Sequence, residues 1–433
     1  MNRLERTVYN LVRNNPKLKD SIRNIYQRTY DLLPAPSSQT AYPVTSRPGY
    51  FYGFHDHTPF SFDNTKLLAC KHSIPLRMPK LGEPLEVGYF DGEDFQNYHP
   101  VSETKAWLWH MGCKLQWRGP HNQMVFNDHK DGKNIARVVD LDTNQSRDLT
   151  ESIASVSPDG KWAVGYSFAR VARCMPGYGY HYDVKDPEIE ADAPQENGIH
   201  IVDMESGNAR MLFSIAHLAA IEPEPSMKDA LHFVTHAVFN PGSNRFIFLH
   251  RWVQRSGQIE KRWSRMFSCG INGDDLYLFP TTDMVSHIGW RGDDYVIAYC
   301  RTKQYDDQYV LFRDQVKEEL EAVGVGQLNS DGHPSFDPSG RWMITDTYPD
   351  RRRLQNLVLF DTHTNKRYNL CKLLMPARHQ SPSSYEHWAC DLHPRWDRVG
   401  RYVCFDSTFT GERSLCTIDL KNDLSTSGPK FVK

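Results

Sequence analysis

The sequence predicts an all-β fold, a seven-bladed β-propeller with a short N-terminal helical appendage. Seven copies of one short pattern recur along the 433 residues: a pivot residue, two variable positions, an aromatic or aliphatic residue, and then a polar turn. The pivots are His57, Lys114, Ile153, His236, His287, His333 and His393. Successive pivots lie 39 to 83 residues apart. A unit that recurs every ~40 to 50 residues, with insertions, is typical of a propeller.

Segments with strand character follow the pivots. After His333 they are residues 341–347, 356–361 and 366–371, in which β-branched or aromatic residues mostly alternate with others and turn residues separate the runs. Together with the strand that carries the pivot, they make the four antiparallel strands of one blade. We therefore assign residues 45–433 to the propeller.

The first 33 residues have a helical pattern instead. Their apolar residues form two stripes at helical spacing, Leu4, Val8, Leu11 and Val12, then Leu18, Ile22, Ile25 and Tyr26. Asn15 followed by Pro16 is a helix cap and first-turn pair, which predicts two helices. Residues 1–33 contain seven basic and three acidic residues, a local charge of +4. Such an appendage could pack on the propeller, lie on an anionic membrane surface or dock on a protein. Residues 34–44 are the predicted linker.

The composition argues against several classes of protein. A net charge of −2 gives no reason to expect nucleic acid as a partner. No apolar run approaches the ~18 residues of a membrane span, and the N-terminus lacks the apolar core of a secretory signal. We therefore expect a cytoplasmic protein, with peripheral attachment at the inner membrane as an alternative. The nine cysteines include no CxxC pair, which favours buried small hydrophobes over disulfides.

Blade topology predicts where the functional residues lie. The first strand of a blade is innermost, so its start lines one mouth of the central channel, and the loops between second and third strands open on the same face. The five pivot histidines should therefore converge at one mouth. The loops would add Arg170, Arg251, Arg301, Tyr348 and Arg351 there, and a long insertion at about 168–197 would add Tyr178 and Tyr180.

This mixture of side chains suits an acidic saccharide. Imidazoles bind transition metals or move protons, guanidinium groups pair with carboxylates, and tyrosines can act as acid or base. Breaking a uronate glycosidic bond by β-elimination requires that the carboxylate is neutralised, the α proton removed and the leaving oxygen protonated. Asp331 beside His333 and Asp391 beside His393 either orient histidines or close turns.

Two units of the chain resemble a known repeat. The segments GHPSFDPSGRWMITDTYPD, around His333, and DLHPRWDRVGRYVCFDS, around His393, resemble the TolB-like propeller repeat. Within that group the chain is similar to the seven-bladed oligogalacturonate-lyase type along most of residues 45–420. The resemblance implies a divalent transition metal, Mn²⁺ or Zn²⁺, on histidines at the channel mouth with an arginine close by. Propeller lyases that act on ulvan or on rhamnose-glucuronate linkages use histidine, tyrosine and arginine in the same location.

We expect the following roles. The resemblance makes His287, His333 and His393 the metal candidates. The catalytic candidates are His236, Tyr178, Tyr180, Arg251 and Arg301, and the substrate-binding candidates are His57, Arg170, Tyr348 and Arg351. The predicted function is a lyase that cleaves uronate-containing oligo- or polysaccharide. The alternative is a non-catalytic propeller of surface-polysaccharide metabolism, which binds saccharide or protein and is tethered by its N-terminal helices.

Overall fold

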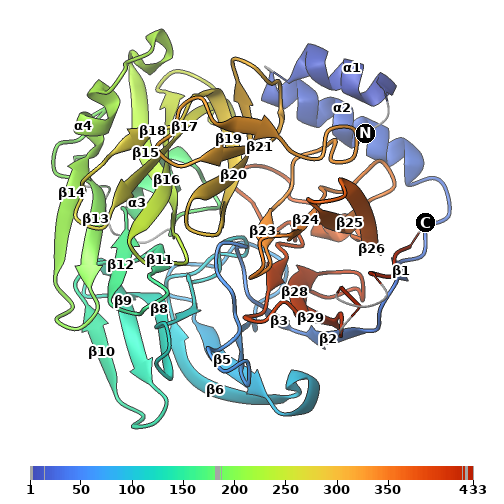
Figure 1. Cartoon of the computed structure of the whole chain (residues 1–433), viewed down its shortest axis with the longest axis horizontal. Helices are drawn as coiled ribbons and strands as arrows, with labels where there is room; N and C mark the ends of the chain where they lie inside the picture. Colours follow the sequence, from blue (N-terminus) through green and yellow to red (C-terminus); the bar gives the residue numbers. More distant parts are fainter. Residues whose placement is uncertain are drawn as a thin grey trace.

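Seven antiparallel sheets form a ring, which confirms the predicted seven-bladed propeller (Figure 1). A computed structural model describes residues 3–13, 15–180, 186, 188–421, 423–424 and 428–432.

None of the described helices is long and apolar enough to span a membrane.

Each sheet is one blade, and its strands run in chain order from the channel outward. The first blade contains β3 (Tyr50–Phe51), β4 (Leu67–Lys71), β5 (Leu85–Asp91) and β6 (Asn97–Thr104). The second contains β7 (Gln116–Trp117), β8 (Gln123–Lys130), β9 (Lys133–Asp140) and β10 (Ser146–Leu149). The third contains β11 (Ser155–Val156), β12 (Trp162–Gly165), β13 (Gly198–Asp203) and β14 (Ala209–Ser214). The fourth contains β15 (Ala230–Phe239), β16 (Arg245–Gln254), β17 (Arg262–Gly270) and β18 (Tyr277–Leu278).

The remaining blades complete the ring. The fifth contains β19 (Thr281–Arg291), β20 (Tyr295–Thr302), β21 (Gln308–Arg313) and β22 (Leu320–Ala322). The sixth contains β23 (Ser335–Phe336), β24 (Trp342–Asp346), β25 (Leu354–Asp361) and β26 (Lys366–Leu374). The seventh contains β27 (Arg395–Trp396), β28 (Tyr402–Ser407) and β29 (Ser414–Asp419). Short helices in the connections are η1 (Glu93–Phe95), α3 (Phe168–Cys174), α4 (Ile215–Ala220), η2 (Pro225–Met227) and η3 (Ala377–His379).

The N-terminal segment closes the ring. Its strand β2 (Val44–Pro48) pairs with β29 as the outermost strand of the seventh blade. Within the predicted linker, β1 (Gln39–Thr40) adds a fifth strand to the sixth blade. The helices α1 (Arg3–Val12) and α2 (Pro16–Tyr30) precede these strands, and the Asn15 side chain accepts a hydrogen bond from the Leu18 amide, which confirms the predicted cap.

The blade strands are buried on both faces. In β16 every residue from Phe246 to Val253 is buried, because neighbouring blades cover both sides of each sheet and remove apolar surface from water. All nine cysteines are free and buried, as the sequence predicts.

Polar side chains bind four of the blades to the next blade in the ring. They occupy one equivalent place in the second strand or just beyond its end, three residues after the residue that pairs with the end of the inner strand. These inter-blade polar residues are Asn127, Tyr166, Asp346 and Asp406.

Each of the four bonds to backbone in the inner strand of the next blade or within two residues of it. The Asn127 amide bonds both backbone groups of Ile153 at 2.8 Å. The Tyr166 hydroxyl accepts from the amide of His236 at 3.3 Å, and Asp346 accepts from the amide of His393 at 3.1 Å. Three of the bonded residues, therefore, are pivots of the repeat.

Asp406 makes the same connection across the ring closure. Its two carboxylate oxygens accept from the amides of Tyr52 and Gly53, at 3.0 and 2.9 Å. One of them also accepts from the Arg395 guanidinium at 3.4 Å. Because Asp406 and Arg395 are each 1% exposed, neither charge has water as an alternative partner.

We expect Asp406→Asn to lower the free energy of unfolding by about 2–4 kcal/mol, since it leaves a buried guanidinium without its carboxylate and sets an amide N–H against a backbone N–H. Chemical denaturation measures the change. The matched control is Asp419→Asn, which removes the carboxylate that pairs with Arg401 at 2.6 Å on the outer strand. That partly exposed pair contributes about 0–1 kcal/mol. Equal effects of the two substitutions would contradict the role of Asp406 in closure.

Candidate functional site

Four of the five pivot histidines converge at one mouth of the channel. The ring of Phe54 lies at their centre, with centroids 5.0 Å from His236 and His393, 6.0 Å from His333 and 6.3 Å from His287. All four histidines are at most 5% exposed. The topological argument from the sequence therefore places these side chains correctly.

Irregular backbone turns several of these histidines toward the channel. The pairing of β15 with β16 shifts register between Thr235 and Val238, and that of β19 with β20 shifts between Val285 and Ile288. These β-bulges contain His236 and His287, and a bulge re-aims the side chain it carries. His236 and His393 also adopt positive φ angles of 57° and 44°, which few non-glycine residues do.

An excursion of the first blade, residues 52–59, fills the mouth. Its inner strand stops after Phe51 and resumes pairing only at Phe60. Gly53 is required where this excursion crosses the β6–β7 connection, because its φ is +112° and an added Cβ would lie 2.7 Å from the amide nitrogen of Gly112. The excursion also carries His55, whose ring lies 5.1 Å from that of His333.

A sixth imidazole reaches the mouth from the same β6–β7 connection. The ring of His110 lies 4.7 Å from those of His393 and His387 and 4.6 Å from that of Tyr178. His110 is 1% exposed. It is no pivot, since it stands four residues before Lys114, and the repeat pattern gave no signal for it.

Three of the histidines are oriented by a hydrogen bond at Nδ1. His393 Nδ1 lies 2.7 Å from the carbonyl oxygen of Gly53. Carboxylates take the same role for the others: Asp346 lies 2.8 Å from His333 Nδ1, and Asp331 lies 3.0 Å from His287 Nδ1. A proton held at Nδ1 leaves Nε2 as the lone-pair nitrogen, which is the usual arrangement of a metal-binding histidine.

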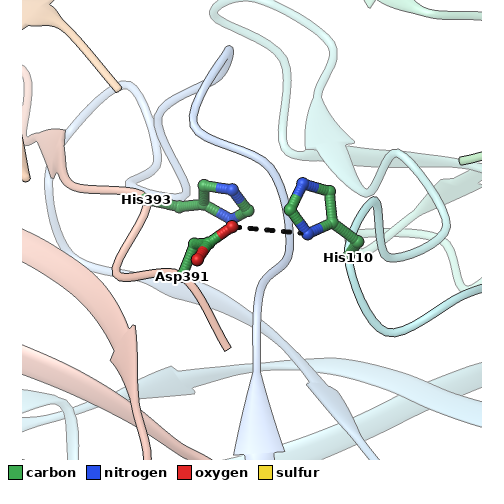
Figure 2. Close-up of side chains that lie close together, drawn as sticks. All are labelled: His110, Asp391 and His393. Carbon is green, nitrogen blue, oxygen red and sulfur yellow. Dashed lines mark ion pairs between the residues drawn. The ribbon is translucent and has the colours of Figure 1, made fainter. Parts of the chain in front are cut away.

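Several of these ring nitrogens are buried without a hydrogen-bond partner. They are Nε2 of His333, Nε2 of His393, and both nitrogens of His110. A buried polar atom without a partner is costly unless a ligand supplies one. Among the described residues, one group offers ligand atoms that all lie within 4.8 Å of one another: His110, Asp391 and His393. Figure 2 shows these side chains close together, with Asp391 Oδ2 3.8 Å from His110 Nδ1.

This group shares only His393 with the predicted metal set. His333 and His287 are next to it, with ring centroids 4.3 Å from His393 to His333 and 4.0 Å from His333 to His287. Two imidazoles and a carboxylate are a donor set that suits Mn²⁺ or Zn²⁺, so the residues present fit a divalent cation.

Burial sets the protonation states at the mouth. It lowers the pKa of five imidazoles well below the ordinary value, with neighbouring positive or protonatable groups adding to the effect, in His55, His110, His236, His333 and His393. Burial also raises the pKa of Asp346 to about 6, and burial with the charge of Asp346 raises that of Asp391 to about 7. At neutral pH the imidazoles are therefore uncharged and their free nitrogens can accept a proton or a metal.

Arginine and tyrosine meet at the same mouth. Arg251 donates through Nη2 to the carbonyls of Val285 and Ser286, next to His287, and its buried Nε has no partner. Burial, followed by the charge of Arg262, lowers the pKa of Arg251 to about 10. The two guanidinium groups repel each other, so an anion that binds beside both of them would be stabilised.

Two predicted tyrosines also lie at this mouth. The ring of Tyr178 is 6.3 Å from that of His236, and Tyr348 is 5.9 Å from His333. Burial raises the pKa of Tyr178 to about 12. Both phenols therefore keep their protons at neutral pH, since the pKa of Tyr348 also lies well above its ordinary value because of burial.

The structure gives other partners to the remaining predicted residues. Arg170 bonds Asp186 at 2.9 Å inside the third-blade insertion, and Tyr180 stacks on Phe168 in the core. Arg301 pairs with Asp283 and Asp307, and Arg351 pairs with Glu5 of α1. His57 bonds the carbonyl of Ala154 at 2.8 Å. None of these contacts leads to the His110–His393 group. Residues 181–185 and 187 of the insertion lie outside the described residues.

One carboxylate acts on a different histidine from the one beside it in the sequence. Asp331 orients His287 of the preceding blade, whereas Asp346, at the end of β24, orients His333. The aspartates at the ends of β24 and β28 were visible in the two quoted repeats as the segments MITD and CFD. Their equivalent position in the two repeats was the sequence signal that could have identified these aspartates.

The fold and site together define a seven-bladed propeller with a histidine-rich channel mouth. No protein-family model and no curated protein sequence matches the chain. Among solved structures, it is similar to the oligogalacturonate lyase of Vibrio parahaemolyticus, with 14% identity and a TM-score of 0.56 over 89% of this chain and 93% of the lyase. An oligogalacturonate lyase in complex with manganese also has 14% identity, and its TM-score is 0.55 over 90% and 94% of the two chains. This likeness shows the fold.

The protonation states predict that acid destabilises the protein. Below about pH 6.5 each of the five imidazoles is protonated in the unfolded chain but stays neutral in the folded one, which costs about 1.4 kcal/mol per pH unit for each. Asp346 and Asp391 act in the opposite direction, because their raised pKa values let the folded state take up protons first. Five imidazoles outweigh two carboxyls, so we expect the free energy of unfolding to fall between pH 6 and pH 5.

Urea denaturation at pH 7, 6 and 5, with a chelator present, measures this loss. His236→Asn should flatten the decline, since it removes one imidazole and asparagine tolerates the positive φ of 57° at this position. Equal stability of the natural protein at pH 6 and pH 5 would contradict the protonation states described.

Proposed function

We propose that the protein is a carbohydrate-active propeller that cleaves uronate-containing oligo- or polysaccharide by β-elimination. One observation carries the proposal. At one buried mouth of the channel, imidazole nitrogens without hydrogen-bond partners lie together with two guanidinium groups and protonated phenols. These are the three kinds of group that the reaction needs. The overall likeness to oligogalacturonate lyases supports a propeller scaffold for such chemistry.

The substrate carboxylate would bind where positive charge is concentrated. Arg251 offers a buried N–H without a partner, and Arg262 lies near enough that its charge lowers the pKa of Arg251. His110, Asp391 and His393 would hold a divalent cation, with the free Nε2 of His333 beside them. A bound cation would act as a Lewis acid that withdraws charge from the carboxylate and makes the α proton more acidic.

Proton transfer would fall to neutral groups on either side of the sugar. His236 is the candidate base, because its Nδ1 has no partner and its lowered pKa leaves the imidazole unprotonated. The proton on C5 passes to this nitrogen, the C4–O bond breaks, and a C4=C5 double bond forms. Tyr178, which keeps its proton, is the candidate donor to the leaving oxygen.

A non-catalytic saccharide-binding propeller is the alternative. The observation that favours it is the burial of the site, in which Phe54 lies among the imidazoles and is itself 3% exposed. Cleavage requires that a sugar displaces this ring or enters beside it, past Tyr348 and Tyr178. Binding alone would need only a charged end group that reaches Arg251, which is 7% exposed.

We expect the purified protein to bind one Mn²⁺ or Zn²⁺ after incubation and dialysis, measured by elemental analysis. His393→Ala and His110→Ala should each weaken the affinity roughly 100-fold or more, since each removes a ligand. The control is His99→Ala, a surface histidine that pairs with Asp91 at 3.0 Å. Undiminished metal content in both mouth variants would refute the assignment of ligands.

We expect incubation with galacturonate or other uronate oligosaccharides to give an unsaturated product, followed by its ultraviolet absorbance. Arg251→Lys should lower kcat/KM roughly 100-fold, because lysine cannot reproduce the planar guanidinium fork, and His236→Asn should lower kcat by a similar factor. Arg313→Lys, at an exposed pair with Glu319, is the matched control. Absence of unsaturated product from every uronate, with saccharide binding retained, would favour the alternative function.

A further inference from the structure

The helix α1 docks on the propeller through its polar side. Glu5, Tyr9 and Arg13 form one stripe at four-residue spacing, and all three contact the propeller. Tyr9 donates to Asp307 at 3.3 Å, and Arg13 bonds Asp306 at 2.8 Å. Glu5 accepts from Arg351 at 3.2 Å, on the rim of the neighbouring blade. These contacts of α1 with the propeller are therefore hydrogen bonds and ion pairs.

The second helix docks in the same way. Asn24, Gln27 and Asp31 share one side of α2 and its C-terminal cap. Asn24 accepts from Gln380 at 2.6 Å, and Gln27 donates to the carbonyl of Asp350 at 2.9 Å. Asp31 accepts two bonds of 2.8 Å from the Arg353 guanidinium. Figure 1 shows α1 and α2 together at the edge of the ring, beside the fifth and sixth blades.

Because the polar sides face the propeller, the apolar stripes face solvent. Exposed apolar side chains of this segment are Val8 36%, Leu11 79%, Leu18 46%, Ile22 37%, Ile25 66%, Tyr26 37%, Leu32 86% and Leu33 50%. They account for eight of the seventeen exposed large hydrophobics in the described part of the chain. An amphipathic helix normally buries its apolar side, and apolar side chains gathered outward mark a surface that a partner covers.

The charges beside this apolar surface point to an anionic partner. Lys17 and Arg28 are exposed on α2, and both flank the stripe of Leu18, Ile22 and Ile25 on one side of the helix. Two of the three acidic residues among residues 1–33, Glu5 and Asp31, are paired with propeller arginines. Basic side chains that flank an apolar stripe are the pattern of helices that lie in the interface of an anionic bilayer.

We propose that α1 and α2 form a membrane-docking surface, which inserts Leu11, Leu18, Ile22 and Ile25 between the headgroups of an anionic bilayer. The helices remain docked on the propeller by their polar sides. The protein thus binds the bilayer surface peripherally.

Docking by this surface brings the channel mouth toward the bilayer. The α2 partner Gln380 lies in the β26–β27 connection, which also carries Asp391 and His393 of the candidate site. The α1 partner Asp307 lies between β20 and β21, a connection that opens on the mouth face. The charge of Asp331, the residue that bonds His287, also contributes to raising the pKa of Tyr9. This orientation rests on the proposed function for its purpose: a site that takes saccharide would then face saccharide displayed by the membrane.

Co-sedimentation of the full-length protein with vesicles tests the proposal. We expect it to bind vesicles of phosphatidylglycerol and phosphatidylcholine but not vesicles of phosphatidylcholine alone, and to dissociate at high salt. The triple variant Leu18→Gln, Ile22→Gln and Ile25→Gln should bind the vesicles with an affinity that is lower by roughly tenfold or more. Its circular dichroism should be unchanged. The double variant Lys17→Gln and Arg28→Gln should lose the preference for anionic lipid.

Val399→Gln is the matched control, since Val399 is 69% exposed and lies between β27 and β28, in a connection on the face opposite the mouth. It should bind as the natural protein does. Equal sedimentation with both kinds of vesicle, or undiminished binding of the triple variant, would overturn the proposal. Dimers in light scattering that the triple variant abolishes would also overturn it, because a second copy would then cover the helices.

Orientation can be measured on the bound protein. The natural cysteines are all buried, so a fluorophore can be attached selectively at Tyr385→Cys, on the β26–β27 connection, or at Val399→Cys. Vesicles with brominated acyl chains should quench the first probe and leave the second bright. Stronger quenching at position 399 would show that the mouth faces away from the bilayer.

Discussion

One hydrogen-bonding device links the blades and positions the site: a polar side chain near the end of a second strand binds the backbone with which the next blade begins. Asn127, Tyr166, Asp346 and Asp406 do so at equivalent places. Backbone groups at these starts have no ladder partner of their own, and burial makes an unpaired group costly. The device satisfies them and fixes the backbone of three pivots, Ile153, His236 and His393.

The site depends on two of these residues in particular. Asp346 binds the amides of both His333 and His393, and it also orients the imidazole of His333. Asp406 fixes Gly53, whose carbonyl in turn orients the imidazole of His393. The carboxylates that hold the ring together therefore also select the nitrogen that each histidine presents. Structural and functional roles cannot be separated at Asp346, because its two oxygen atoms bond both the backbone amides and the His333 imidazole.

The repeat was sufficient to predict the fold and the face on which the site lies. Blade count follows from the pivots, and the convergence of His236, His287, His333 and His393 follows from strand order alone. His110 and His55 could not be predicted, because they reach the mouth from connections whose path depends on contacts such as that of Gly53 with Gly112. The pairing of Asp331 with His287 could not be predicted either, because it joins two blades and the repeat does not define how neighbouring blades are placed.

The appendage shows a second limit of sequence patterns. The stripes of residues 1–33 were visible as helical periodicity, and so was the cap at Asn15. Periodicity tells which residues share a side of a helix, but it does not tell which side meets the protein. Here Asn24, Gln27 and Asp31 bond partners on the propeller rim. The choice of face depends on residues far along the chain: Arg353, for example, lies 322 positions after its partner Asp31.

The pairing of β2 with β29 has a consequence for the order of synthesis and folding. Val44 pairs with Ile418, so a strand made early waits for the one made last. The entropic cost of closing so long a loop must therefore be met late in folding. Blades can form one after another as the chain leaves the ribosome, but the ring stays open until the seventh blade exists. The rim that receives α2 includes Arg353 and Gln380, which are also late products. A nascent or truncated chain would thus carry its exposed apolar helices untethered, and only the finished ring would hold them in place.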